Sequence, residues 1–288
     1  MDIKDIPVRV TGPGSQPGEQ DGQTLEYIDM PSDMAKYVPP QTPEPEAVEH
    51  LEGAREAMSW LRRALADYRP GADPLIANLS ALDDESRDLV NQILGEGEVS
   101  VTYNGAVRAK TQESVLAGVW RTLYLDADDN VSVDLMEVAD VPHVVRLLDG
   151  RERPIDASAG GAPEDVPNAL PILVELASRR EDLRRDGEPH SINLSLLPLS
   201  EAELEFLDHR LGRGPVDLLS RAYGRCQVIS TLTPNIWWVR YYNSMGTPIL
   251  NSLEVVDVPQ VVPAAPEDLR DSAVRLEEIL APYWADGI

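Results

Sequence analysis

The chain has 288 residues, and its 50 acidic against 25 basic side chains give a formal net charge of −25. Because this charge repels phosphate backbones, it argues against a protein that binds nucleic acid. The single cysteine excludes an internal disulfide bond and fits a reducing compartment.

The N-terminal region is predicted to be a disordered, acidic and Pro-rich tail over residues 1–46, since it has little apolar periodicity. It lacks the apolar core of a secretory signal, and no apolar run in the chain approaches the ~20 residues that span a bilayer. We therefore expect a cytoplasmic protein without membrane insertion. Tyr27, Met30, Met34 and Tyr37 stand among prolines and acids, a composition suited to docking in extended form. Packing of the tail on its own domain is the alternative.

A first helix is predicted after the tail, because apolar residues recur there at three- and four-residue steps. These residues are Leu51, Ala54, Met58, Leu61 and Leu65.

The rest of the chain is internally repetitive. Sliding the sequence against itself by 117 residues superimposes residues 82–145 on residues 199–262 without a gap. Fifteen of the 64 positions are identical, against roughly one in sixteen by chance. The identities include Trp120 with Trp237, and much of residues 137–145 with residues 254–262. This pattern indicates a duplication.

The second unit shows which elements to expect. Ile192, Leu194 and Leu196 alternate as in a short half-buried strand. Ser200 and Glu203 form the capping box of a helix, and β-rich runs separated by turns follow. A closing helix is predicted to begin at Ala-Pro-Glu-Asp, residues 265–268, and the same four residues occur at 162–165.

These elements predict an α+β fold of two homologous repeats, each a small antiparallel meander sheet packed with helices. The predicted units are the tail at 1–46, a first, degenerate repeat at 47–150 and a second domain at 162–288. Residues 146–161 are the predicted linker.

The two repeats differ most in a short segment of the second one, which indicates an interaction face there. Trp237 is predicted to be core because both repeats carry it, whereas Trp238, which replaces Arg121, is predicted to lie on a contact surface. Three arginines of this segment form a basic cluster suited to a carboxylate or to the acidic tail, although plain surface charge is an equal alternative. The predicted partner-binding residues are Arg221, Tyr223, Gly224, Arg225, Cys226, Trp238, Arg240, Tyr242 and Asn251.

Cys226 allows two interpretations. In the first it is a sulfur carrier, a transient metal ligand or an oxygen-sensing thiol, whose pKa neighbouring Arg225 lowers. In the second it is a small buried apolar residue. A stable metal centre needs about four nitrogen or sulfur ligands, and the chain has one cysteine and four histidines without metal-ligand spacing.

No catalytic signature is present. The Gly-x-Gly pairs at 95–97 and 212–214 follow predicted helices rather than strands, so they are caps and turns rather than nucleotide-binding loops. The prediction is therefore a protein that is not an enzyme and has no cofactor or metal.

Residues 197–280 resemble the C-terminal domain of the HupH/HyaF family of hydrogenase expression/formation proteins. The resemblance extends more loosely over the whole chain. Two positions depart from the family pattern: Ala222 stands where glycine is expected and Arg225 where asparagine is expected. The family pattern falls on Gly212, Gly214, Tyr223, Gly224, Cys226, Trp237, Trp238, Asn251, Glu254 and Pro259.

The resemblance implies an accessory protein, or chaperone, in the maturation of an uptake nickel–iron hydrogenase. Its partners would be the iron–sulfur small subunit before export and other hydrogenase maturation proteins. Two alternatives stay open: a thiol-dependent delivery of sulfur or an iron–sulfur cluster through Cys226, and a scaffold that links other maturation proteins.

Overall fold

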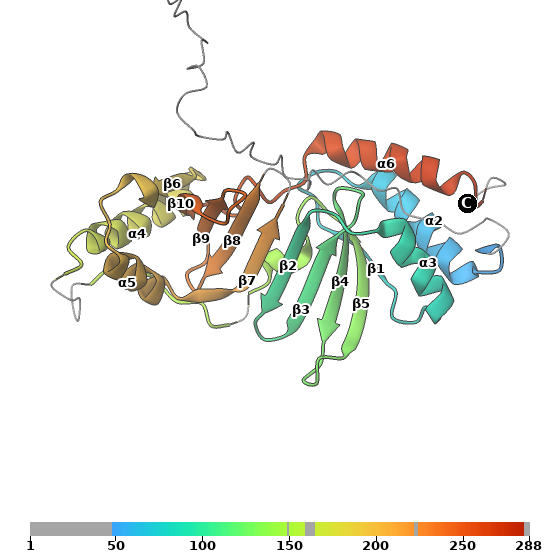
Figure 1. Cartoon of the computed structure of the whole chain (residues 1–288), viewed down its shortest axis with the longest axis horizontal. Coiled ribbons are helices and arrows are strands. Elements are labelled where there is room, and N and C mark those ends of the chain that lie inside the picture. Colours follow the sequence, from blue (N-terminus) through green and yellow to red (C-terminus); the bar gives the residue numbers. More distant parts are fainter. Residues whose placement is uncertain (1–47, 149, 159–164, 222–223, 285–288) are drawn as a thin grey trace, which may run out of the picture. The chain divides into compact units, whose positions relative to one another are not determined.

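An antiparallel sheet of ten strands is the centre of an α+β fold (Figure 1). The fold comes from a computed structural model that describes residues 48–148, 150–158, 165–221 and 224–284. The strand order is β1-β5-β4-β3-β2-β7-β8-β9-β10-β6, so each half of the chain contributes five neighbouring strands. The predicted tail, residues 1–46, lies outside the described residues.

The first half contains α2 (Glu52–Asp67), β1 (Leu75–Asn78), α3 (Asp84–Leu94), β2 (Val99–Asn104), β3 (Arg108–Glu113), β4 (Val119–Leu125), β5 (Val131–Val138) and the 3₁₀ helix η1 (His143–Arg146). The second half contains α4 (Ala169–Asp186), β6 (His190–Asn193), the 3₁₀ helix η2 (Leu194–Leu196), α5 (Glu201–Leu211), β7 (Arg213–Ser220), β8 (Arg225–Thr231), β9 (Ile236–Tyr242), β10 (Pro248–Val255) and α6 (Pro266–Leu280).

The two halves join where β2 pairs antiparallel with β7. The sequence predicts two small sheets, and the structure instead continues one sheet across this junction. The reason is visible in the strand pattern: Val101 and Tyr103 share one face of β2, Val216 and Leu218 share one face of β7, and all four are buried in one core. Pairing the two strands extends a single apolar layer.

The 117-residue offset of the sequence also relates the elements. The bounds of α5, β9 and β10 are those of α3, β4 and β5 displaced by 117 residues. At the junction, Val101 lies opposite Leu218, which is its counterpart under the same offset. The sheet is therefore arranged pseudo-symmetrically about this residue pair.

The helix ends follow the predicted capping chemistry. Ser200 Oγ accepts a hydrogen bond from Glu203 N (3.2 Å), and Glu203 Oε2 accepts one from Ser200 N (2.8 Å), which confirms the capping box of α5. Gly95 and Gly212 follow α3 and α5 with φ values of 55° and 65°, a region that favours glycine.

The strand predicted through Leu196 is shorter than expected. β6 ends at Asn193, whose side-chain oxygen accepts a hydrogen bond from Ser195 N (3.0 Å) and starts the η2 turn. Leu194 remains buried, whereas Leu196 is exposed. Local turn formation at an Asn residue therefore overrides the alternating pattern.

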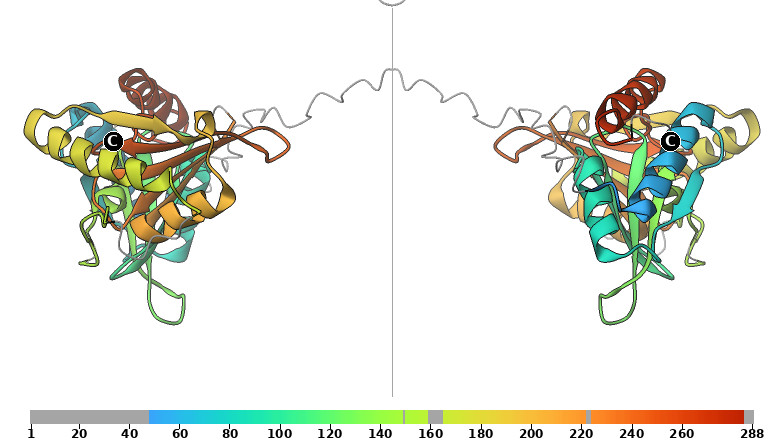
Figure 2. Two further views of the ribbon diagram at one scale, coloured as in Figure 1. Left: turned by 90° about the vertical axis from the view of Figure 1, so that its left-hand side faces the viewer. Right: turned by 90° about the vertical axis from the view of Figure 1, so that its right-hand side faces the viewer.

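Helices cover the two halves separately. On the first half, α2 packs against α3 and against α6, although α6 follows the second half in the chain. On the second half, α4 packs against α5 (Figure 2). The opposite side of the central strands is covered by η1 and by the loops that follow β5 and β10. None of the helices in the described ranges is long and apolar enough to cross a membrane.

Candidate functional site

Arg225, Gln227, Arg240 and Tyr242 form a polar strip on one face of β8 and β9, which we call the cation–aromatic strip. The strand register places Arg225 opposite Tyr242 and Gln227 opposite Arg240. Arg225 is exposed, and the other three side chains are partly exposed. Because residues two apart on a strand share a face, Trp238 lies on this same face, deeper under the helices.

Both arginines of the strip lie over aromatic rings. The guanidinium carbon of Arg240 is 4.7 Å from the centre of the Trp238 ring, and that of Arg225 is 6.0 Å from the centre of the Tyr242 ring. The Tyr242 hydroxyl donates to Gln227 Oε1 (3.4 Å), and Gln227 Nε2 donates to Asp217 Oδ1 (2.9 Å). These contacts hold two cationic groups in place on the surface of a strongly acidic chain.

The prediction that Trp238 is an exposed contact residue is wrong. Trp238 is 2% exposed and packs with Leu253 and Ile229 beneath α4 and α5. The two tryptophans do face opposite sides of β9, as expected, but the sheet is covered on both sides at this point. Trp237 lies in the core on the other face, and its indole N–H donates to the Asp257 carbonyl (3.2 Å).

Cys226 lies on the face of β8 opposite to the cation–aromatic strip and is 3% exposed. Burial raises the pKa of its thiol to about 11, whereas the first of the two interpretations expected Arg225 to lower it. The Arg225 side chain is on the other face, so it does not stabilise a thiolate. Tyr241 stands opposite Cys226, and burial raises the pKa of that hydroxyl to about 12. The structure therefore favours the interpretation of Cys226 as a buried apolar residue.

The remaining predicted residues lie around the strip. Asn251 of β10 stands opposite Arg240, and its backbone N–H donates to Ser195 Oγ (2.8 Å). Arg221 and Gly224 are exposed in the β7–β8 connection, and Gly224 has a φ of 98°. Tyr223 lies outside the described residues.

Sequence reasoning missed a buried polar cluster in the first half. The Glu137 side chain has no exposed surface, accepts a hydrogen bond from His143 N (3.0 Å), and lies 2.7 Å from Nδ1 of His143. His143 Nε2 lies 2.5 Å from the Tyr124 hydroxyl. The cluster ties η1 to β4 and β5. The second half has Gln260 at the position equivalent to His143. This difference between the halves is the signal that could have drawn attention to the cluster.

No group of three or more His, Cys, Asp or Glu side chains is arranged to hold a metal ion within the described part of the chain.

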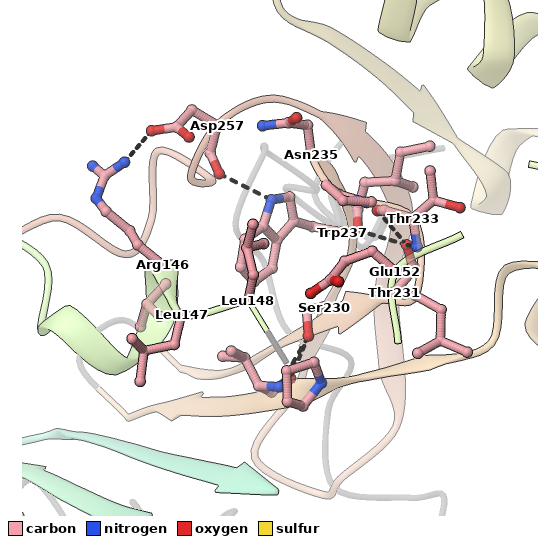
Figure 3. A pocket seen from close by; sticks show the side chains of 16 residues that line it. Arg146, Leu147, Leu148, Glu152, Ser230, Thr231, Thr233, Asn235, Trp237 and Asp257 are labelled. Carbon is pink, nitrogen blue, oxygen red and sulfur yellow. Dashed lines mark hydrogen bonds and ion pairs between the residues drawn. The ribbon is translucent and has the colours of Figure 1, made fainter. Parts of the chain in front are cut away.

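A second feature is an apolar cavity of about 160 Å³ on the Trp237 face of the second half (Figure 3). Its walls come from residues 145–148 around the end of η1, from the β8–β9 turn and from Trp237. Arg146 and Asp257 form an ion pair at its edge. Engineered apolar cavities of about 150 Å³ bind benzene, so this one has room for an apolar side chain.

Comparison with known sequences places the chain in a family. The sequence model of the HupH hydrogenase expression protein, C-terminal conserved region, matches residues 51–150 and again residues 166–283. A hydrogenase expression/formation protein, HoxQ, from Cupriavidus necator is 42% identical over 290 residues, which cover 98% of each chain. HupH from Rhizobium leguminosarum bv. viciae is 41% identical, covering 78% of this chain and 80% of its own.

A more distant relative is the hydrogenase-1 operon protein HyaF of Escherichia coli, 30% identical over 93% of both chains. The solved structure of the hydrogenase expression protein HupH from Thiobacillus denitrificans is 33% identical, covers 40% of this chain and 95% of its own, and has a TM-score of 0.38.

Proposed function

The chain belongs to the HupH family of hydrogenase expression proteins, and from this premise we propose that it is a non-enzymatic accessory protein in the maturation of an uptake nickel–iron hydrogenase. Its client in this proposal is the iron–sulfur small subunit before export. The observation that carries the proposal is the 42% identity to a hydrogenase expression/formation protein along nearly the full length of both chains.

The cation–aromatic strip is the proposed client-binding surface. Arginines that lie over aromatic rings keep their hydrogen-bonding groups available to carboxylates, and arginine and tyrosine are enriched where proteins bind one another. The strip is cationic on a chain with a net charge of −25. It therefore suits an acidic segment of the client.

A charge reversal tests this surface. We expect Arg225→Glu with Arg240→Glu to reduce the recovery of immature small subunit with the affinity-tagged full chain by roughly tenfold, since two lost charge contacts of somewhat under 1 kcal/mol each make about one tenfold step. Quantitative mass spectrometry of the co-purified small subunit measures this effect.

Arg270→Glu is the control. It reverses one charge, against two in the double variant, on the exposed side of α6 away from the strip, and should leave recovery unchanged. Equal recovery with the double variant and the control would remove the strip from the proposal. Failure of the unmodified chain to recover small subunit, in either its apo or cluster-loaded form, would contradict the proposed client itself.

We further propose that the two halves are diverged copies of one unit, with boundaries near 47–150 and 162–288. The two separate matches of the family model and the common offset of 117 residues in α5, β9 and β10 support this proposal. In this view the second copy keeps the arginine and aromatic residues for the client. The first copy has an ion pair between Arg121 and Asp134 at the positions of Trp238 and Asn251.

A further inference from the structure

The connection from β6 to α5 is longer than the equivalent connection in the first half. The bounds of β6 are those of β1 displaced by 115 residues, whereas the bounds of α5 are those of α3 displaced by 117. The second half therefore has two additional residues between this strand and this helix.

Two equivalent hydrogen bonds show where the additional residues lie. Ser80 Oγ accepts a hydrogen bond from the backbone N–H of Asp134 (3.0 Å), and Ser195 Oγ accepts one from the backbone N–H of Asn251 (2.8 Å). Asp134 and Asn251 are 117 residues apart, but the two serines are 115 apart. The additional residues therefore follow Ser195.

The added segment is apolar and points to solvent. Between the serine and the N-cap residue of the helix, the first half has only Ala81 and Leu82, whereas the second half has Leu-Leu-Pro-Leu at 196–199. Leu196 is 80% exposed and Leu197 is 40% exposed. Two leucines have thus been added to the surface of η2 and the residues after it.

Ile249 of β10 is a third exposed apolar side chain. The register of β10 with β9 shifts between Pro248 and Leu250, so Ile249 is the bulged residue. Its counterpart Ser132 lies at a similar irregularity of β5, and the Ser132 hydroxyl donates to the carbonyl of Tyr124 (3.2 Å). Ile249 has no polar group to use in this way, and it is 63% exposed.

The first half shows that these positions lie together. A polar pocket of about 340 Å³ there is lined by residues that include Ser80, Leu123, Ser132, Arg121 and Asp134. Their counterparts in the second half are Ser195, Arg240, Ile249, Trp238 and Asn251. The added leucines follow Ser195 directly, so the three exposed apolar side chains adjoin the cation–aromatic strip.

The polar groups at this place are paired in the first half and unpaired in the second. Arg121 and Asp134 form an ion pair in the first half. At the equivalent positions, Trp238 Nε1 and Asn251 Oδ1 are buried and have no hydrogen-bond partner among the described residues. Folded proteins leave few such groups unsatisfied, so a group from a bound partner would complete the hydrogen bonding here.

The charge at this place is also different. Arg240 takes the place of Leu123, and Arg225 belongs to the same strip. Asp208, which takes the place of Asn91, is the only carboxylate among the counterparts of the pocket residues. The second half thus offers exposed apolar side chains beside two arginines.

We propose that Leu196, Leu197 and Ile249 form an apolar extension of the cation–aromatic strip, and that the two together bind a client segment in which apolar side chains stand next to carboxylates. The inference rests on the proposed function, since it takes the strip as the client-binding surface. Grouped exposed apolar side chains mark interaction sites. Burial of the leucines and the isoleucine supplies affinity, and the arginines orient the carboxylates.

Serine substitutions test the apolar extension. Leu196→Ser with Ile249→Ser should reduce the recovery of immature small subunit with the affinity-tagged full chain by roughly tenfold, because apolar area stays in water. The reduction should persist in ~0.5 M salt, which screens the contacts of the arginines. Val131→Ser with Val274→Ser, at positions 53% and 62% exposed, is the matched control and should leave recovery unchanged.

Photo-cross-linking identifies what the surface binds. With p-benzoylphenylalanine in place of Leu196, the cross-linked small-subunit peptide should contain Asp or Glu next to the attached apolar residue, and the same substitution at Val274 should give no client product. Full recovery with the serine variant, while the unmodified chain recovers the client, would overturn this inference and leave the proposed function standing. A cross-link between two copies of this chain would also overturn it. No recovery with the unmodified chain would overturn both.

Discussion

Glu113, at the end of β3, carries a carboxyl group in surroundings that disfavour its charge. Burial raises the pKa of Glu113 to about 7, and the negative charges of Glu98 and Asp268 act in the same direction. Its Oε1 accepts a hydrogen bond from Gly118 N (3.3 Å). This position therefore favours the neutral carboxyl over the carboxylate. Because folding raises the pKa of Glu113, the free energy of unfolding depends on pH.

The direction of that dependence follows from the raised pKa. The stabilisation from the neutral carboxyl is fully present below the ordinary pKa of 4.5 and is lost as pH rises through about 7. We expect Glu113→Gln to raise the free energy of unfolding at pH 8 by about 2 kcal/mol and to change it little at pH 4.5. Urea unfolding at the two pH values measures this, and exposed Glu96→Gln is the control. Equal effects at both pH values would contradict the assignment.

The adjacent tryptophans show how far single-residue prediction reaches. A strand places Trp237 and Trp238 on opposite faces whatever surrounds it, and this part of the prediction holds. Whether a face is covered depends on α4 and α5, which are distant in sequence from β9. The prediction for Trp238 was wrong for this reason. For Cys226 the sequence left two interpretations open, and the same long-range packing decides between them.

At the scale of elements, α6 packs directly on Gly118: a Cβ atom placed on Gly118 would lie 2.1 Å from Leu269 Cδ2. Gly118 has a φ of 76° and no space for a side chain. α6 begins as predicted, with Pro266 at its first position and Glu267 and Asp268 in its first turn. The sequence predicts this helix but not its location, because nothing local indicates that a helix following the second half packs on the first.

Gly118→Ala should therefore displace α6, at a cost of about 3 kcal/mol from the strained backbone and the collision with Leu269. Gly71→Ala is a matched control, since Gly71 has a similar φ of 81° with open space around it, and should cost only about 1 kcal/mol. Thermal or urea unfolding compares the two variants. A cost for Gly118→Ala no larger than the control would show that α6 does not depend on this contact.

At the scale of the whole molecule, the β2–β7 junction makes the halves depend on each other. Val101 and Tyr103 share a core with Val216 and Leu218, and that core is closed by Val144 of η1. Neither half buries this layer alone. The sequence indicated two units with separate sheets, but strand pairing between them is a long-range event that local patterns do not encode.

A fragment of residues 162–288 should therefore not behave as a folded monomer. We expect β7, whose edge is free in the fragment, to pair antiparallel with β7 of a second copy. Leu218 would then lie near Leu218 of the other copy, in the place that Val101 takes in the intact chain. Light scattering coupled to size-exclusion chromatography, with circular dichroism, distinguishes a folded dimer from an unfolded chain. A stable folded monomer would contradict the shared core.

The strands at the two ends of the sheet, β1 and β6, have only four residues each, whereas β5, β7 and β10 have eight. Such short edge strands present few unpaired backbone groups to an incoming strand, so the sheet is a poor template for edge-to-edge aggregation. Because these edge strands are short, we expect a partner of this protein to contact a face of the sheet through side chains, and not to extend the sheet with a further hydrogen-bonded strand.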